Sequence, residues 1–292
     1  MDNITVRASD GTPLEFEKFG LFTDGAINVR LAKIDIAPSD IIIDANLRTA
    51  SGIIELLMIT DAVRRKYSAS TNLHLRCKYL PYARQDRVCN EGEAFSLEVM
   101  CNIINSQNFA SVTVWDVHSK VSLNLLNHVT NVHVSDLITA DIIGNKVLVS
   151  PDKGAFDRVL ACSKKFNRPM IVADKIRDPS TMEIKGIKIL DEYLAKIEDG
   201  TIDISNGFIM IDDICDGGRT FIELAKVVRP LFLTYAKTWG DFGHSTIDLW
   251  VTHLIASYGF DVFRNGAFRT VDNIYTANCF RDDMPDFVHV VT

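Results

Sequence analysis

The sequence predicts an α/β fold built on largely parallel sheets, and two observations lead to this prediction. Short runs rich in β-branched residues are typical of buried strands. They occur at 40–44, 73–80, 111–117, 146–150, 168–175 and 207–213. Amphipathic stretches separate most of these runs, and residues 51–67 and 94–107 have the period of helices. Such alternation indicates parallel sheets covered by helices.

Two domains are expected because one motif occurs twice. An apolar segment ending in acidic residues appears as VTVWDVH at 112–118 and as FIMIDDICDGG at 208–218. No Pro-, Ser- or Gly-rich linker separates the two halves. We therefore expect an N-terminal domain over residues 1–143 and a C-terminal domain over residues 144–292.

Composition excludes several classes of protein. The 292 residues are 47% hydrophobic, enough for a full core, and the net charge of -7 argues against binding nucleic acid through bulk charge. Six cysteines form no CxxC pair, no signal peptide is recognisable, and no stretch approaches about 18 apolar residues. We expect a cytoplasmic protein with reduced thiols and no membrane span.

The segment 208–230 carries the strongest chemical signal. A strand leads into Asp212 and Asp213, a glycine-bearing loop follows over 214–219, and a helix is expected to end before Pro230. Free backbone N–H groups at such a loop bind anions, and vicinal carboxylates suit the hydroxyls of a ribose. The alternative is an ordinary strand–turn–helix with solvated acids. Thr220 and Glu223 have the spacing of a capping box.

Three further clusters follow predicted strands. Arg84 and Arg87 in YARQDR are spaced to face one polyphosphate, and the alternative is a surface charge cluster. Asp116 and His118 could ligate a divalent ion, and the alternative is a helix cap with a surface histidine. Lys175 and Arg177 lie two apart on one side of a strand, where they could stabilise developing phosphoryl charge or could simply be solvated.

In their order along the chain, these motifs resemble those of the ribose-phosphate pyrophosphokinase (PRPP synthetase) family. The resemblance covers roughly residues 20 to 290 and implies a divergent, compact member with two tandem phosphoribosyltransferase-like domains. It implies the following assignments: ATP binding by Phe22, Asp24, Arg84, Gln85, Asp86 and Arg87; metal binding by Asp116, His118 and Asp152; catalysis by Lys175 and Arg177; and ribose-phosphate binding by Asp212, Asp213, Asp216, Gly217, Gly218, Arg219 and Thr220.

The chain also departs from the family pattern. The family's phosphate loop reads Asp-Thr-x-Gly-Thr, whereas Gly217, Gly218 and Arg219 stand between Asp216 and Thr220 here. The double glycine could open the loop for a diphosphate chain, or Arg219 could replace lost hydroxyl contacts to a monoester. In addition, Tyr258 is inserted into the family's Thr-His-x-x-x-Ser-Gly stretch, Ala26 replaces a glutamate of the adenine-binding flag, and residues 234–250 look like an insertion.

The resemblance implies transfer of the β,γ-diphosphate of Mg-ATP to the C1 hydroxyl of a phosphorylated ribose. The expected acceptor is ribose 5-phosphate, the cofactor is Mg²⁺, and the assembly is a homo-oligomer, a dimer or a hexamer. Three alternatives stay open: a phosphoribosyltransferase, a catalytically inactive regulatory homologue, and the same chemistry on ADP-ribose, which some phage-type relatives use in NAD salvage. A phosphoribosyltransferase would lack the counterparts of YARQDR and DKIR.

Overall fold

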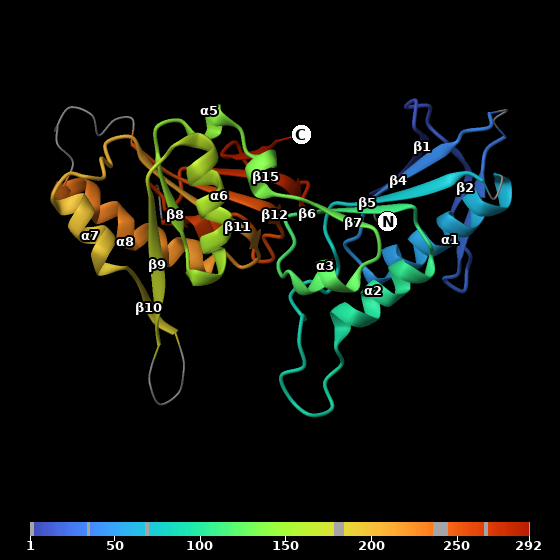
Figure 1. The fold of residues 1–292 in the computed structure, drawn as a ribbon, viewed down its shortest axis with the longest axis horizontal. Helices are drawn as coiled ribbons and strands as arrows, with labels where there is room; N and C mark the ends of the chain where they lie inside the picture. The colour runs from blue at the N-terminus through green and yellow to red at the C-terminus, as the bar shows by residue number, and fades with distance from the viewer. Residues whose placement is uncertain are drawn as a thin grey trace. The chain divides into compact units, whose positions relative to one another are not determined.

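The computed structural model describes residues 3–33, 36–67, 70–177, 184–235, 245–265 and 268–291. The chain forms two compact units, Met1–Val132 and His133–Thr292, each built on its own sheet (Figure 1). The division falls earlier than the expected boundary at 143/144, so that the short helices α4 (Val134–Leu137) and α5 (Ala140–Ile143) lie in the second unit. Among the described residues, no helix is both long and apolar enough to cross a membrane.

Unit 1 contains a five-stranded sheet in the order β1-β4-β5-β6-β7. Its strands are β1 (Asn3–Ala8), β4 (Asp40–Asn46), β5 (Asn72–Cys77), β6 (Ser111–Trp115) and β7 (Val129–Val132). The four strands from β4 to β7 run parallel, and β1 joins the edge antiparallel to β4. The carboxyl ends of the parallel strands therefore share one edge, where ligand-binding groups usually gather in α/β proteins.

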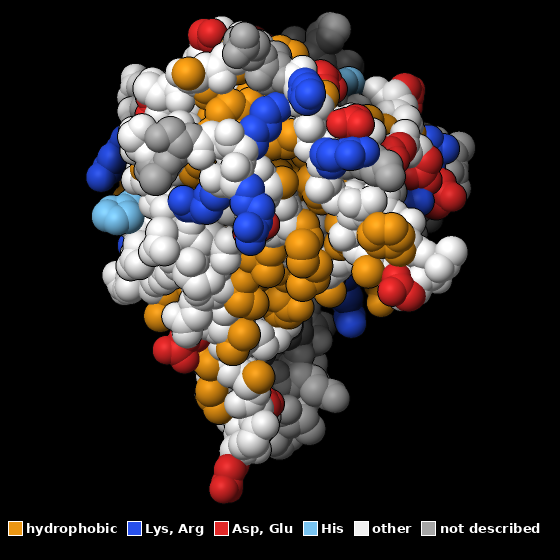
Figure 2. All heavy atoms as spheres, turned by 90° about the vertical axis from the view of Figure 1, so that its right-hand side faces the viewer, with side chains coloured by type: hydrophobic (Ala, Val, Ile, Leu, Met, Phe, Trp, Pro, Cys, Tyr) orange, Lys and Arg blue, Asp and Glu red, His pale blue; other side chains and the backbone are white. Residues whose placement is uncertain are grey.

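Two helices, α1 (Ala50–Lys66) and α2 (Ser96–Ser106), pack apolar residues against this core. Thr49 caps α1, because its Oγ1 accepts a hydrogen bond of 3.1 Å from the N–H of Gly52. The outer side of α1 exposes Ile54 and Met58, at 44% and 45%. Figure 2 shows apolar side chains gathered into a patch on this face of the molecule, with Lys and Arg side chains beside it. The strands β2 (Phe16–Leu21) and β3 (Ile27–Leu31) form a separate antiparallel hairpin.

Unit 2 contains a seven-stranded sheet in the order β10-β9-β8-β11-β12-β15-β16 (Figure 1). The strands are β8 (Val147–Ser150), β9 (Met170–Arg177), β10 (Ile184–Ile189), β11 (Gly207–Cys215), β12 (Thr246–Leu254), β15 (Asn273–Cys279) and β16 (Val288–Val290). All neighbours pair in parallel except β10, which is antiparallel to β9. Both sheets are thus mainly parallel, which confirms the predicted fold class.

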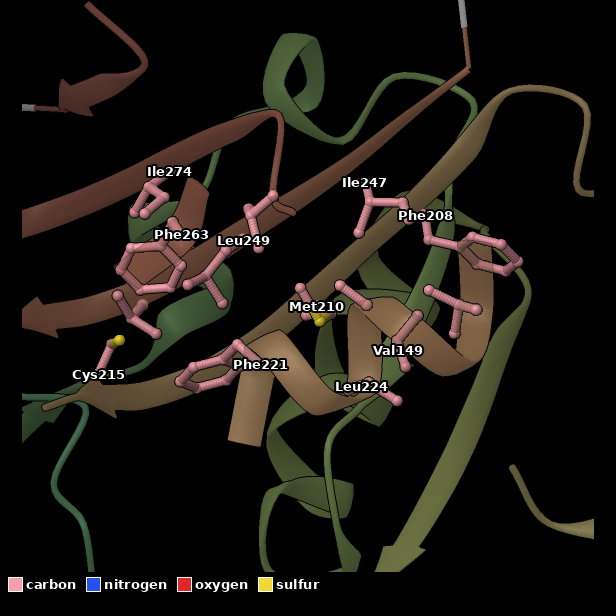
Figure 3. Packing of buried hydrophobic residues seen from close by; sticks show 14 of the residues in the cluster. Val149, Phe208, Met210, Cys215, Phe221, Leu224, Ile247, Leu249, Phe263 and Ile274 are labelled. Atoms are coloured by element: carbon pink, nitrogen blue, oxygen red, sulfur yellow. The ribbon is translucent and has the colours of Figure 1, made fainter. Parts of the chain in front are cut away.

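The core of unit 2 lies between β11, β12 and the helix α8 (Arg219–Tyr235). Figure 3 shows Met210 and Phe208 of β11 facing side chains of α8, among them Phe221 and Leu224, and all four are at most 4% exposed. The near-continuous apolar run of β11 reflects a strand buried on both faces. Unit 2 also contains the helices α6 (Phe156–Phe166) and α7 (Asp191–Glu198).

Two expectations about α8 were wrong. The helix continues through Pro230 to Tyr235, although a proline inside a helix costs about 3 kcal/mol. Phe232 beyond the proline is 6% exposed and its ring lies 5.1 Å from that of Phe208, so that burial offsets the cost. The helix also begins at Arg219, which places Thr220 inside the first turn and not at the cap; the N–H groups of Phe221 and Ile222 donate to the carbonyl of Gly218.

The interpretation of residues 234–250 as an insertion is corrected at its C-terminal end only. Residues 236–244 lie outside the described part of the chain, but Thr246–Leu254 form β12, a buried strand between β11 and β15. Trp250 within it is completely buried. Residues 246–250 therefore belong to a central strand of the sheet of unit 2.

Candidate active site

In unit 1, Asp116 directly follows β6. Its backbone has a φ of +42°, a left-handed conformation that few residues other than glycine, asparagine and aspartate adopt readily. Its N–H donates to the carbonyl of Val132 at 2.8 Å, and the residue is 5% exposed. His118 is exposed two positions later. A strained backbone at a strand end is a common feature of binding sites.

The segment after β5 borders a cavity of about 530 Å³, a size that suits a small ligand. Arg84 and Gln85 line it together with Arg48 and Thr49 from the start of α1. Tyr82 in the same segment has a φ of +62°. The cavity thus collects two guanidinium groups near the positive end of a helix dipole, a combination that favours an anionic ligand.

Two other predicted ATP-binding groups of this segment lie next to Arg84 and Gln85. Arg87 is exposed and Asp86 is half-buried. The flag residues lie in the turn between β2 and β3, where Phe22 is 57% exposed. Asp24 accepts a hydrogen bond of 3.0 Å from the N–H of Ala26 through its Oδ1, which fixes the turn and presents the ring of Phe22 to solvent.

In unit 2 the structure joins two residues that the sequence assigned to different roles. Lys175 Nζ donates to Asp152 Oδ2 at 2.6 Å. Asp152 also caps the turn that leads into α6, since its Oδ1 accepts from the N–H groups of Gly154 and Ala155 at 2.9 and 3.2 Å. Burial acts to raise the pKa of Asp152, but Lys175 and the two N–H groups outweigh it and lower that pKa. The carboxylate is therefore held charged.

The backbone of Arg177 ends β9, and its side chain lies outside the described part of the structure, as do residues 178–183. The expected placement of Lys175 and Arg177 on one side therefore stays a prediction. Lys175 itself is part of the β9–β10 hairpin, opposite Ile187.

At the carboxyl end of β11, Asp212 and Asp213 both face Arg158 of α6. The guanidinium nitrogens lie 3.3 Å from Asp212 Oδ1 and 3.8 Å from Asp213 Oδ1. Burial and the neighbouring Asp213 carboxylate raise the pKa of Asp212 well above its usual range, and Arg158 opposes this rise. Arg158 therefore contacts both carboxylates of this crowded pair.

The loop after the acid pair is shorter than expected, because β11 extends to Cys215. Two aromatic rings lie against the positions that side chains of the double glycine would occupy. A Cβ on Gly217 would lie 2.9 Å from Tyr258 Cε2, and one on Gly218 would lie 2.7 Å from Phe263 Cζ. Gly218 also has a φ of +75°, which favours glycine. Phe263 is completely buried whereas Tyr258 is 76% exposed, so the space beside Gly218 is filled by the core and that beside Gly217 by a surface ring. That the double glycine opens the loop stays a prediction.

The remaining loop residues lie at the N-terminus of α8. Asp216 and Thr220 are half-buried, and Arg219 is exposed with no hydrogen bond or ion pair to any described residue. Backbone N–H groups of the first turn of a helix are available to an anion. Arg219 thus adds an unused guanidinium beside a potential phosphate site.

A metal ion would need oxygen ligands and room for water. Within the described ranges, no three His, Cys, Asp or Glu side chains lie close enough together to hold a metal ion alone. Mg²⁺ commonly takes only one or two protein carboxylates and completes its shell with waters and phosphates. The chemistry of Asp116 and Asp152 fits this manner of binding.

Sequence reasoning missed Arg158, Tyr258 as a neighbour of the loop, and Phe263. A signal existed for Arg158: in α6 it lies three residues after Ala155 and four before Cys162, and both of these are buried. A charged residue on the buried face of a helix indicates a charged partner. For the two aromatic residues the sequence offered no comparable signal, because their contact with the glycines is long-range.

No protein-family model matches the chain. Curated relatives do: the ribose-phosphate pyrophosphokinase of Campylobacter jejuni is 25% identical over 214 residues, covering 71% of this chain and 65% of the relative. Ribose-phosphate pyrophosphokinase 2 of Archaeoglobus fulgidus is 26% identical, covering 73% and 70%. The chain thus spans about two thirds of the length of these relatives.

Among solved structures, the phosphoribosylpyrophosphate synthetase of Mycobacterium smegmatis shares the fold, with a TM-score of 0.72 at 16% identity over 97% of this chain and 87% of that one. The fold and the acid pair define an α/β protein of two phosphoribosyltransferase-like domains. The sequence matches are more specific. By sequence the chain resembles the ribose-phosphate pyrophosphokinases and is a divergent relative of them, at 25% and 26% identity.

Proposed function

We propose that the protein is an ATP-dependent pyrophosphokinase that transfers the β,γ-diphosphate of Mg-ATP to the C1 hydroxyl of a phosphorylated ribose. The observation that carries the proposal is the acid pair Asp212–Asp213, which leads within one loop to the N-terminus of α8. Carboxylates accept hydrogen bonds from the two ribose hydroxyls, and the helix N-terminus with its loop N–H groups receives the 5-phosphate.

The donor side rests on residues of unit 1. Arg84 and Gln85 border the 530 Å³ cavity, and Arg87 stands exposed in the same segment. Arginine forks match phosphate oxygens, so these side chains suit the triphosphate of ATP. The exposed ring of Phe22 suits stacking on the adenine. A phosphoribosyltransferase would have no use for this set, which favours the pyrophosphokinase.

The proposed reaction is one in-line displacement. The acceptor's anomeric oxygen forms a bond to the β-phosphorus of ATP and its proton passes to solvent. The bond between the β-phosphorus and the α,β-bridging oxygen breaks, and AMP leaves with that oxygen. Lys175 and Arg177 neutralise the charge that develops on the transferred group. Asp116 and His118 of unit 1, and Asp152 of unit 2, are the proposed ligands of Mg²⁺, which would supply charge neutralisation on the phosphates when bound.

Ribose 5-phosphate is the proposed acceptor, and the aromatic rings that lie against Gly217 and Gly218 support it because they limit the space beside the loop. ADP-ribose is a second candidate because Arg219 is exposed and makes no ion pair with any described residue. A free guanidinium beside the 5-phosphate position would match a second phosphate. An inactive regulatory homologue is disfavoured by the retained Lys175.

We further propose a cytoplasmic homo-oligomer, a dimer or a hexamer. The exposed apolar residues Ile54 and Met58 on α1 support association with a second copy, since large apolar side chains gathered on a surface favour contacts between proteins.

The decisive experiment incubates the protein with Mg-ATP and either acceptor and identifies the products by mass and phosphorus NMR. Formation of AMP with a 1-diphosphorylated ribose 5-phosphate supports the leading assignment. The variant Arg219→Ala refines it: a loss of about tenfold in kcat/KM for ADP-ribose, about 1.4 kcal/mol, with ribose 5-phosphate poorly used throughout, would make ADP-ribose the acceptor. If neither acceptor leads to release of AMP, the proposed function is contradicted.

A further inference from the structure

Arg158 is buried to a degree that is unusual for arginine. Its side chain is 11% exposed, and it lies on α6 three residues after the cap residue Ala155 and four before Cys162, both at most 1% exposed. Arginine is seldom buried without partners that use its charge. The guanidinium of Arg158 is therefore expected to contact groups of opposite charge.

The guanidinium of Arg158 contacts both carboxylates of the acid pair, Asp212 and Asp213. Nη1 donates to Asp212 Oδ1 at 3.3 Å, and Nη2 lies 3.8 Å from Asp213 Oδ1. The side chains of Asp212 and Asp213 are 20% and 5% exposed. A planar fork with two nitrogens can hold two carboxylates at once, whereas the single ammonium of a lysine cannot do so with the same geometry.

The acid pair needs such a partner because two adjacent carboxylates repel each other in a part-buried site. Without a cation one of them takes up a proton, as in other pairs of like charges. A protonated or rotated carboxyl group would lose an acceptor for a ribose hydroxyl. Arg158 thus acts on the chemical state and the orientation of the pair together.

We propose that Arg158 is a positioning residue for the acceptor sugar: it holds the side chains of Asp212 and Asp213 in a fixed orientation as acceptors for the two ribose hydroxyls. This proposal rests on the proposed function, because it takes the acid pair as the ribose site. Arg158 itself need not contact the sugar or any reacting atom.

Within the described part of unit 2, few other charges act on Asp212. On β11 itself they are Asp213 and the Cys215 thiol, whose pKa burial raises so far that it stays neutral, with Asp216 beyond it. From α6 it is Arg158, and on β12 the register partner of Asp212 is the apolar Val251. Loss of Arg158 therefore removes a cation that opposes the elevated pKa of Asp212.

The test compares wild type with Arg158→Lys and Arg158→Gln. We expect the KM for the ribose acceptor to rise about tenfold or more in Arg158→Gln, the scale of a lost charged hydrogen bond. The KM for ATP should stay unchanged. The acid limb of the pH profile of kcat/KM for the acceptor should move to higher pH, because the acids then protonate more readily. Arg158→Lys should keep the pH profile closer to wild type but still raise the acceptor KM.

Arg229→Gln is the matched control. Arg229 lies on α8 of the same unit and pairs with Asp272 at 3.3 Å, so its loss removes an ion pair without touching the acid pair. A purely structural role of Arg158 would lower the melting temperature and leave the acceptor KM and the pH profile of the folded enzyme unchanged, and that result overturns the proposal. If Arg158→Gln does not fold, an acceptor KM of Arg158→Lys equal to wild type overturns it equally.

Calorimetry with ribose 5-phosphate in the absence of ATP measures binding of the sugar alone. It therefore tests the role of Arg158 independently of the proposed transfer reaction. A wild-type protein that binds the sugar but transfers no diphosphate contradicts the proposed reaction alone, and weaker sugar binding by Arg158→Lys still supports the role of Arg158. A wild-type protein that neither binds nor transfers contradicts both.

Discussion

Lys175 Nζ lies 2.6 Å from Asp152 Oδ2, so a proposed catalytic cation is paired with a proposed metal ligand. The two side chains are 23% and 27% exposed, which makes the pair only partly screened by water. Asp152 cannot offer its Oδ2 to a metal and to Lys175 with full strength at the same time. Binding of a metal would therefore free Lys175 for the phosphates, and this exchange connects metal loading to the position of the cation.

Replacement of Lys175 by alanine should lower kcat by about a hundredfold or more, the scale for loss of a charge-stabilising group. The KM for ATP should change little, because the group acts on the transition state. Steady-state kinetics measures both. Lys188→Ala is the control. Lys188 lies on the same hairpin as Lys175, and its partner is the exposed Asp191 at the start of α7. An unchanged kcat in Lys175→Ala would remove Lys175 from the catalytic group.

The sequence predicted the strands that carry the acids well, because β-branched runs such as that of β11 are buried on both faces and cannot be mistaken for surface segments. Local rules failed where tertiary contacts outweigh them. Pro230 does not end α8, since Phe232 and Tyr235 pack on the core beyond it. The contacts of Arg158 with Asp212 and Asp213 join residues that are 54 or more positions apart, and no local pattern reports such a distance.

Replacement of His118 by alanine should reduce activity in a manner that high Mg²⁺ or Mn²⁺ partly restores. His118 is exposed, so the melting temperature should stay within a few degrees of wild type. Asp116→Asn is the companion variant, because asparagine also adopts the left-handed backbone at this position and only the charge is lost. Unfolding of His118→Ala would instead favour a structural role, and a loss that no metal concentration restores would argue against metal binding.

The two glycines of the phosphate loop should respond differently to alanine. Gly218→Ala places a Cβ 2.7 Å from Phe263, which is completely buried, and imposes a φ of +75° on alanine. We expect a loss of about 1–2 kcal/mol in stability and a marked rise in the KM for the acceptor. Gly217→Ala meets Tyr258, which is 76% exposed and can move aside. Denaturation and acceptor kinetics on both variants measure the difference; equal effects would contradict the contacts with the two rings.

Asp212 should lower the stability of the folded protein at neutral pH. Burial and Asp213 raise its pKa in the folded state, so its favourable contribution is complete below the unfolded pKa of about 3.9 and is lost as the pH rises through the folded pKa. Asp212→Asn imitates the protonated form. We expect it to raise the melting temperature at pH 8 by about 3 °C, or about 1 kcal/mol for a unit of this size, and to abolish use of the acceptor.

The gain should shrink as the pH approaches 4, because the wild-type carboxyl is then protonated as well. Scanning calorimetry of both proteins across this range measures the trend. Asp191→Asn serves as the control, since the side chain of Asp191 is 86% exposed and its replacement should leave the melting temperature unchanged at every pH. A lower melting temperature of Asp212→Asn at pH 8 would mean that Arg158 stabilises the charged pair by more than burial and repulsion destabilise it. In that case the charged acid pair would stabilise the fold, whereas the groups of a binding site often destabilise it.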